Sequence, residues 1–250
     1  MSGTRRCVVA GNWKMFKGPG DTTRFFEEFL RRHSGRPDRE VVFFPPAVSI
    51  TTAAAALLAW PEIGLGVQNI HWEKEGAFTG ETSAPMAAAA GARFALIGHS
   101  ERRHVFGETD AQIARKIGAA FAAGLTPVIC VGEKLEERRS GQLEQVLSRQ
   151  LDTALDELAQ PPSFLIAYEP VWAIGTGVNA TPEDAAAAHG FLRQRLRSTI
   201  GSAADATPIL YGGSVKPDNS AALLAAADVD GLLVGGASLD PAGFAAIAAA

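Results

Sequence analysis

The sequence has few cysteines, no long apolar run and no block of like charge, and each of these absences excludes a class of protein. Its two cysteines, Cys7 and Cys130, both lie inside apolar runs, where a free thiol usually packs as a small hydrophobe. A disulfide framework is therefore not expected, and a reducing compartment fits the composition. The apolar run at Cys7 is too short for a signal peptide or a membrane span, so we expect a cytoplasmic protein with no membrane partner.

The charges are nearly balanced. The chain has 23 Lys and Arg against 27 Asp and Glu, which gives a net charge of −4. No basic stripe with interleaved aromatic residues is present, and this argues against nucleic acid as a partner. An anionic ligand would need locally placed donors. No linker rich in Pro, Ser or Gly divides the 250 residues, so we expect a single domain over residues 1–250.

Eight short apolar runs alternate with longer stretches of helical character. The predicted strands are Cys7–Ala10, Val41–Phe44, Leu65–Gln68, Phe94–Ile97, Thr126–Val131, Phe164–Tyr168, Thr207–Tyr211 and Gly231–Val234. Strands that are apolar throughout are typical of a parallel sheet covered by helices on both faces. Eight such repeats in about 250 residues match the usual size of an α/β fold with eight parallel strands, the closed (β/α)8 barrel.

Polar residues and glycines follow several of the predicted strands. They are Asn12 and Lys14 after the first strand, Gly98–Arg102 after the fourth, Glu169 after the sixth, Gly212–Ser214 after the seventh, and Gly235 and Gly236 after the eighth. In a barrel of this kind the chemistry lies at the carboxyl ends of the strands. The opposite ends carry mainly turn residues such as Pro37 and Gly124. We therefore expect the functional site on the carboxyl-terminal rim.

Glu169 ends an apolar strand and leads into an apolar loop that contains glycines. A carboxylate at the mouth of a buried strand is partly desolvated, which favours its neutral form and makes it a stronger proton acceptor. Taken alone, a glutamate at a strand end is more often a surface residue. The rest of the rim favours a general base under a movable lid. The predicted lid is Pro170, Val171, Trp172, Ala173, Ile174, Gly175, Thr176 and Gly177.

Segments from the first strand to the last resemble the triosephosphate isomerase family. They are Gly11–Met15, Gln68 and Asn69, Gly76–Glu81, Ile97–Arg103, Ala167–Gly177, Tyr211–Val215 and Leu233–Leu239. The resemblance implies a TIM-barrel isomerase of glycolysis and gluconeogenesis. Such an enzyme interconverts dihydroxyacetone phosphate and D-glyceraldehyde 3-phosphate through an enediolate, with no cofactor and no metal.

That reaction needs more than a base. General base catalysis gives roughly 10²–10⁴-fold, whereas enzymes usually exceed about 10⁶-fold, so charge stabilisation must supply the remainder. Lys14 can supply positive charge and His99 a directed N–H to the developing oxyanion. The resemblance makes His99 a neutral electrophile, and a short helix starting at Ser100 would disfavour its imidazolium. Glu101 is expected to hold Lys14 in place.

The expected site follows from these roles. The predicted catalytic residues are Glu169, His99, Lys14, Asn12 and Glu101, and the predicted substrate-binding residues are Asn12, Lys14, Gly175, Ser214, Gly235 and Gly236. Loops after the seventh and eighth strands of such barrels often bind phosphate through backbone N–H groups. Each residue alone has an ordinary explanation: a capping histidine, a solvated lysine, an asparagine in a turn, a tight glycine turn. Their convergence on one rim favours the site.

Three other functions fit the sequence less well. Gly175–Ala180 fits a G-x-G-x-x-A dinucleotide pattern, but its glycines do not directly follow the strand, and Arg193–Arg197 stands where the acidic residue is expected. The five histidines show no H-E-x-x-H spacing, which argues against a metal-dependent barrel enzyme. An inactive phosphate-binding barrel would lack a base or an electrophile, yet Glu169, His99 and Lys14 are all present.

The segment Gln68–Glu81 is long for a connection between two elements and carries aromatic residues such as Phe78. Exposed apolar groups on a long loop indicate a partner surface. In the family that the sequence resembles, this loop docks into a neighbouring subunit beside the first strand. The resemblance therefore implies a homodimer in which Thr79 lies at the interface, close to Asn12 and Lys14 of the other chain.

Overall fold

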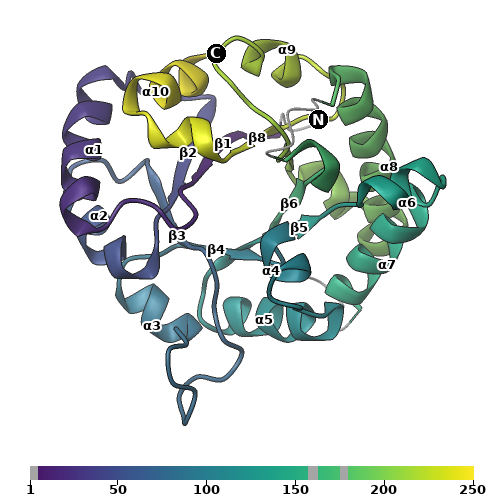
Figure 1. Ribbon diagram of the computed structural model, residues 1–250, viewed down its shortest axis with the longest axis horizontal. Coiled ribbons are helices and arrows are strands. Elements are labelled where there is room, and N and C mark those ends of the chain that lie inside the picture. The colour runs from purple at the N-terminus through teal and green to yellow at the C-terminus, as the bar shows by residue number, and fades with distance from the viewer. Residues whose placement is uncertain (1–4, 157–162, 175–179) are drawn as a thin grey trace.

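The computed structural model describes residues 5–156, 163–174 and 180–250. Eight parallel strands follow one another in sequence order and form a closed barrel, because β1 pairs with both β2 and β8 (Figure 1). The strands are β1 (Cys7–Asn12), β2 (Arg39–Phe44), β3 (Gly64–Val67), β4 (Phe94–Ile97), β5 (Thr126–Val131), β6 (Leu165–Tyr168), β7 (Ile209–Tyr211) and β8 (Gly231–Val234). The predicted (β/α)8 barrel is confirmed.

The predicted strand bounds agree with the structure for β4, β5 and β8 and differ at the ends of the others. Strand β1 continues past its predicted end to Asn12, because it pairs with β2 as far as Phe44. Strand β7 begins at Ile209 rather than at Thr207, because the Thr207 N–H donates to Ala204 in the preceding 3-10 helix and Pro208 has no N–H to donate. These differences leave the order of the elements unchanged.

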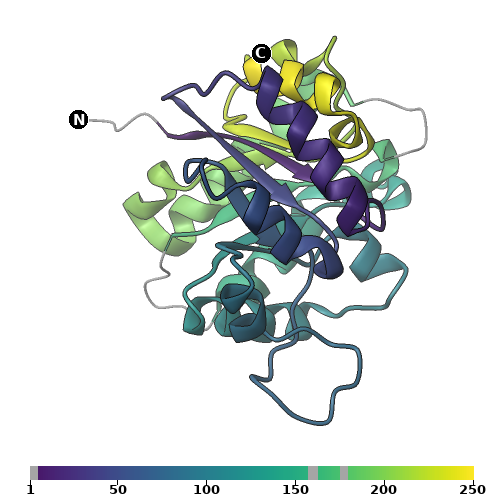
Figure 2. The same cartoon turned by 90° about the vertical axis from the view of Figure 1, so that its left-hand side faces the viewer.

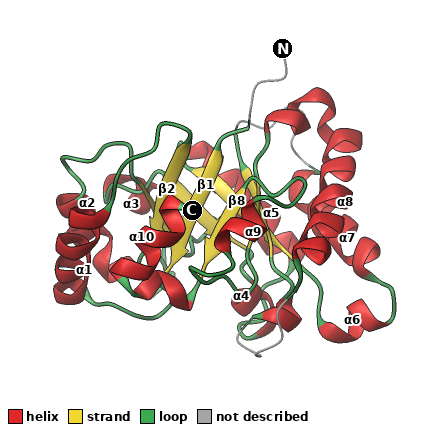
Figure 3. Cartoon of the chain, turned by 90° about the horizontal axis from the view of Figure 1, so that it is seen from above, coloured by secondary structure: helices red, strands yellow, loops and turns green. Residues whose placement is uncertain are grey.

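Helices surround the barrel (Figures 1 and 3). They are α1 (Pro19–Arg32), α2 (Ile50–Ala56), α3 (Ala84–Ala89), α4 (Ser100–His104), α5 (Asp110–Ala122), α6 (Leu135–Arg139), α7 (Leu143–Leu155), α8 (Pro182–Ile200), α9 (Ser220–Leu224) and α10 (Pro241–Ala249). Short 3-10 helices span Ala47–Ser49, Val171–Ala173, Gly201–Ala206 and Gly236–Leu239. None of the helices in the described part of the chain combines the length and the apolar character needed to cross a membrane.

In every strand except β3, alternate residues face two different apolar cores. Residues such as Val8, Ala10 and Leu96 belong to a cluster made of strand residues alone, inside the barrel. Their neighbours, such as Val9 and Ile97, pack with helix residues between barrel and helices. Strands buried on both faces need continuous apolar sequence, which explains the runs that predicted them. The two cores hold the rim of the barrel rigid beneath the site.

The chain between β3 and α3 projects from the body of the barrel (Figure 2). At its base the His71 N–H donates a hydrogen bond to the Thr82 carbonyl at 2.8 Å. The His71 ring packs against Trp72 and Phe78, with ring centroids 4.2 Å apart in each pair. Phe78 is 43% exposed and Thr79 is exposed. The loop is therefore internally ordered but presents an aromatic side chain to its surroundings.

Candidate active site

A cavity of about 330 Å³ opens at the carboxyl ends of the strands. Its lining residues are Asn12, Lys14, His99, Glu169, Ile174, Gly212, Gly213, Ser214, Val215, Lys216, Leu233, Gly235, Gly236 and Ala237. The structure thus brings together most of the residues that the sequence predicted. Glu101 does not line the cavity but contacts Lys14, which does. The predicted donor Gly175 and the lid residues Thr176 and Gly177 lie outside the described residues.

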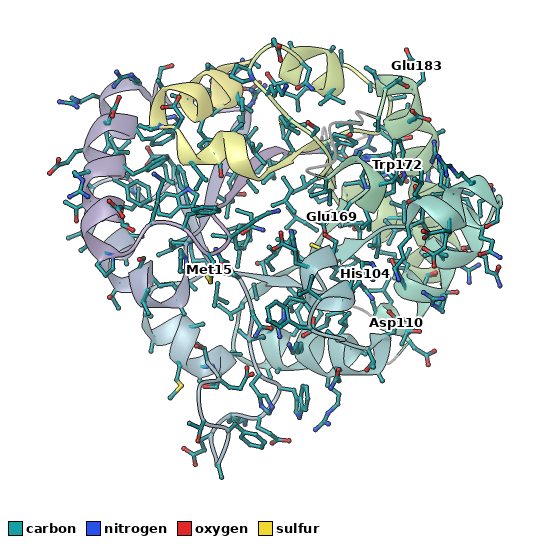
Figure 4. The ribbon with its side chains drawn as sticks, in the orientation of Figure 1. Met15, His104, Asp110, Glu169, Trp172 and Glu183 are labelled. Atoms are coloured by element: carbon teal, nitrogen blue, oxygen red, sulfur yellow. The ribbon has the colours of Figure 1, made fainter. Side chains whose placement is uncertain are left out.

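Glu169 follows β6 and lies near the centre of the ring of strands (Figure 4). Its position depends on the absence of a side chain at Gly132, where a Cβ would lie 1.8 Å from the Glu169 carbonyl oxygen. Gln150 of α7 fixes Gly132 from behind, because its side chain accepts from the Gly132 N–H at 2.8 Å and donates to the Gly132 carbonyl at 3.1 Å. The Glu169 N–H donates to Val131 at 2.8 Å. These backbone contacts therefore fix the position from which the Glu169 side chain extends.

The Glu169 carboxylate is 2% exposed and is bound by two neighbouring residues. Its Oε1 lies 3.0 Å from His99 Nε2, and its Oε2 accepts from the Ser100 N–H at 2.9 Å. Burial raises the pKa of Glu169, but His99 and the Ser100 N–H together lower it by more, so the net pKa is below the ordinary value. The expectation that desolvation would dominate is wrong for this conformation, because the sequence did not reveal these two donors.

His99 immediately precedes α4 and caps it. Its Nδ1 accepts the Glu101 N–H at 3.3 Å, so the proton of the neutral ring lies on Nε2, which points at Glu169. Burial lowers the pKa of His99, but the adjacent carboxylate of Glu169 raises it by more, and the net pKa is above the ordinary value. The expected effect of the helix start is thus outweighed while Glu169 is in contact. The pKa of His99 is therefore raised by this contact and not by the position of the ring at the start of α4.

Lys14 adopts a left-handed backbone conformation, with a φ of 51°, although it is not glycine. Such a conformation costs about 1–3 kcal/mol and persists only where the surroundings hold it. Here the Lys14 N–H donates to Asn12 Oδ1 at 3.0 Å, and Gln68 Nε2 donates to the carbonyls of Lys14 and Phe44, each at 2.8 Å. Lys14 Nζ lies 2.6 Å from Glu101 Oε1, as the sequence predicted. Asn12 therefore shapes the turn and also lines the cavity.

The segments after β7 and β8 form the other end of the cavity. Gly213 is required there, because a Cβ would lie 2.1 Å from the Tyr211 hydroxyl. Gly235 approaches Lys14, whose Cε would lie 3.6 Å from a Cβ at that position. Beyond them the sequence interpretation missed Lys216, which follows Ser214 by two residues and lines the same wall. Its place in the segment after β7 was the signal that could have identified it.

The described part of the predicted lid is held by Glu133, which was not among the residues predicted from the sequence. Val171–Ala173 forms a 3-10 helix that contains Trp172 (labelled in Figure 4). Trp172 Nε1 donates to Glu133 Oε1 at 2.8 Å. The Tyr168 hydroxyl donates to the same oxygen at 3.0 Å. Arg138 lies over the Trp172 ring at 5.4 Å and also pairs with Asp184 in the first turn of α8. These contacts fix both chain segments that flank 175–179.

Within residues 5–156, 163–174 and 180–250, no group of three or more His, Cys, Asp or Glu side chains is arranged to hold a metal ion. The charged groups of the cavity are instead one carboxylate, two lysines and an imidazole. A base, an N–H donor and a cation thus face one space whose far end is lined by glycines and a serine. This arrangement can move a proton next to a carbonyl and stabilise the resulting oxyanion.

Comparison with known proteins agrees with this geometry. The sequence model of the family described as triosephosphate isomerase matches residues 7–250. A triosephosphate isomerase of Solibacter usitatus is 48% identical over 246 residues, which cover 97% of this chain and 98% of the relative. That of Chloroflexus aurantiacus is 49% identical over 240 residues, covering 95% and 96%, and that of Aquifex aeolicus is 44% identical over 243 residues, covering 97% and 98%. The chain belongs to the triosephosphate isomerase family.

Proposed function

We propose that Glu169, His99 and Lys14 carry out the reaction of this enzyme, the interconversion of dihydroxyacetone phosphate and D-glyceraldehyde 3-phosphate. The reaction removes a proton from the carbon next to a carbonyl and creates an enediolate. Glu169 is the base. The single observation that supports this assignment most strongly is the 3.0 Å approach of its buried carboxylate to His99 Nε2 in the cavity that Lys14 also lines.

The contacts of Glu169 explain how its basicity changes during the reaction. When the carboxylate turns from His99 and Ser100 toward a bound triose phosphate, it loses the donors that lower its pKa and keeps the burial that raises it. Glu169 then becomes a stronger base at the moment it meets the substrate. The same movement frees His99 Nε2–H to donate to the substrate oxygen, and Lys14 supplies the balancing positive charge.

The phosphate group of the substrate belongs at the other end of the cavity. The loop glycines Gly235 and Gly236 and the adjacent Ser214 bring backbone close to this space without bulky side chains. Glycine-rich loops of this kind present N–H groups to phosphate oxygens. We place the phosphate here, with the reacting carbons between Glu169 and His99.

Replacing Glu169 by Gln tests the assignment of the base. The variant Glu169→Gln keeps the shape of the side chain but cannot accept the proton, so kcat should fall by at least about 10²-fold. A coupled assay in both directions measures turnover, and circular dichroism checks the fold. Glu27→Gln, the same change at an exposed position on α1, is the matched control and should retain full activity. Unchanged turnover in Glu169→Gln would show that another group is the base.

We also propose a homodimer built through the projecting loop. The support is an exposed apolar surface at two places that such a dimer would join: Phe78 on the loop is 43% exposed, and Met15 and Phe16, next to Lys14, are 93% and 57% exposed (Figure 4). Large exposed apolar side chains gathered at two places indicate an interface. In this dimer Thr79 approaches Lys14 of the partner subunit.

The variant Thr79→Arg tests the interface. A guanidinium beside Lys14 of the partner subunit adds bulk and like charge, so sedimentation should show monomers, with activity reduced at the same time. Thr23→Arg, at an exposed position on α1, is the control and should sediment as the parent does. A fully active dimer of Thr79→Arg would exclude Thr79 from the interface.

We further propose that the chain is one cytoplasmic domain. All eight strands contribute to one barrel, and Cys7 and Cys130 are free thiols, as suits a reducing compartment. A single calorimetric unfolding transition is expected for one domain. Cell fractionation with detection of the native chain tests the location, and recovery outside the cytoplasm would contradict it.

A further inference from the structure

The side chains around the cavity carry no net positive charge to attract an anionic substrate unless Lys216 is included. Lys14 is paired with Glu101 at 2.6 Å, so these two charges offset each other, and Glu169 adds a negative charge. A phosphate monoester carries about −1.5 to −2 charges at pH 7. His99 at most offsets Glu169, so without Lys216 the side chains of the cavity would offer no net positive charge to the substrate that the proposed function requires.

Lys216 is the second cation in the cavity wall, and its charge is not balanced locally. It is exposed and forms no ion pair with any residue that the structure describes. Lysine is suited to such a role, because its ammonium is a compact charge on a flexible stem that can follow a ligand inward.

The backbone beneath this side chain is fixed by Asn219. The Lys216 N–H donates to Asn219 Oδ1 at 2.8 Å, and the Lys216 carbonyl accepts from the N–H groups of Asn219 and Ser220 at 3.3 and 3.1 Å. Asn219 Nδ2 also donates to the Ser214 carbonyl at 3.1 Å. Asn219 thus links the backbone of Lys216 to Ser214, where the phosphate is placed.

We propose that Lys216 captures the phosphate dianion of the incoming substrate at the mouth of the cavity and accelerates association without taking part in proton transfer. The inference rests on the proposed function. A charge at the rim of a cleft concentrates oppositely charged ligands and raises on-rates, typically by about 10–10³-fold for a whole steering field. Lys216 also offsets the repulsion between Glu169 and the phosphate before the substrate is seated.

The experiment compares Lys216→Gln with the parent at low salt, at high salt and with a neutral substrate. At about 10 mM salt, where the Debye length is about 30 Å, kcat/KM for glyceraldehyde 3-phosphate should fall by about threefold to tenfold while kcat stays within about twofold. At about 1 M salt, where the Debye length is about 3 Å, the difference from the parent should vanish. Lys216→Arg should restore the parent values. Neutral D-glyceraldehyde, which lacks the phosphate, should react equally with parent and variant.

Arg31→Gln is the control for net charge. It removes one exposed cation from the last turn of α1, on the far side of the barrel from the cavity, and should leave the salt dependence unchanged. If Lys216→Gln shows the same salt dependence as the parent, the capture role is wrong. A fall of kcat with neutral D-glyceraldehyde would equally overturn it, because Lys216 would then act on the chemistry or the fold.

Competitive binding of inorganic phosphate separates this inference from the proposed function. Its affinity should weaken in Lys216→Gln at low salt and match the parent at high salt, whether or not the enzyme turns over a triose phosphate. Failure of the proposed function would appear instead as a parent protein that does not isomerise the substrate at all. Equal phosphate affinity in parent and variant at low salt would refute capture by Lys216.

Discussion

Two buried carboxylates at the ends of neighbouring strands behave in opposite ways. Glu169, after β6, is 2% exposed, and Glu133, after β5, is 0% exposed. Burial raises the pKa of both, but contact with His99 and Ser100 makes the net pKa of Glu169 low. The net pKa of Glu133 is raised, because its burial outweighs the hydrogen bonds from Trp172 and Tyr168 and the charge of Arg138 at 3.6 Å.

The difference shows that the kind of partner matters more than the number of hydrogen bonds. Both carboxylates accept two or more bonds, but Glu169 has an ionisable partner, His99, at 3.0 Å, whereas the donors bonded to Glu133 are neutral and its cationic neighbour Arg138 lies farther away, at 3.6 Å. A neutral donor stabilises a carboxylate less than an ionisable one does, since it brings no opposite charge. The cavity side of this rim therefore holds a charged base, whereas the lid side holds a carboxyl group closer to its neutral form.

Replacing Gly132 by Ala should have the largest effect, because Gly132 lies between the two carboxylates. A Cβ there would lie 1.8 Å from the Glu169 carbonyl oxygen, so the end of β6 must move. Misplacement of a catalytic group by about 1 Å can cost about 10²-fold, and overpacking costs about 1–3 kcal/mol of stability. Steady-state kinetics and urea unfolding measure both. Gly118→Ala on α5, with nothing within 4 Å of its Cβ, is the control and should be active and at least as stable as the parent.

Changing Glu133 to Leu or Gln should have an intermediate effect, on stability more than on chemistry. Leu removes the shared acceptor of Trp172 and Tyr168, and leaving the buried Tyr168 hydroxyl without this acceptor costs about 1–3 kcal/mol in the free energy of unfolding. Gln keeps an acceptor and should be closer to the parent. Urea unfolding of both variants measures the difference. Equal stability of the Leu and Gln variants would mean that these two hydrogen bonds do not hold the lid segment.

The smallest expected effect is the pH dependence of stability, where the two carboxylates should act with opposite signs. Glu169 has a lowered pKa, so its contribution is present above the unfolded pKa of about 4.3 and is lost as pH falls through its folded pKa. Glu133 has a raised pKa, so its contribution is present below about pH 4.3 and is lost as pH rises through its folded pKa.

Unfolding free energies of the parent, Glu169→Gln and Glu133→Gln between about pH 3 and 6, below the range in which His99 loses its proton, measure these contributions. The parent minus Glu169→Gln should increase with pH, and the parent minus Glu133→Gln should decrease. Two difference curves of the same slope would contradict the comparison, because both carboxylates would then have pKa values shifted in one direction.

The sequence predicted what depends on strand order and failed on what depends on side-chain packing. Because parallel strands in a closed barrel bring their carboxyl ends together, Lys14 and Glu169 could be placed on one rim although they are far apart in the chain. The low pKa of Glu169 could not be predicted, since it requires knowing that this side chain turns toward His99. Glu133 was missed for the same reason: nothing in its sequence neighbourhood reports that Trp172 reaches it.

Gln68 connects the turn at Lys14 to the loop that would form the dimer. Its side-chain amide holds the strained turn at Lys14, and its backbone lies at the base of the loop that carries Thr79. In the proposed dimer, we expect docking of that loop and binding at Lys14 to be linked through Gln68, and linkage requires each to change the other by the same factor. An anion bound near Lys14 should then lower the dimer dissociation constant, and sedimentation with and without inorganic phosphate measures it. Replacing Gln68 by Leu should abolish that dependence, and a persistent dependence would place the linkage elsewhere.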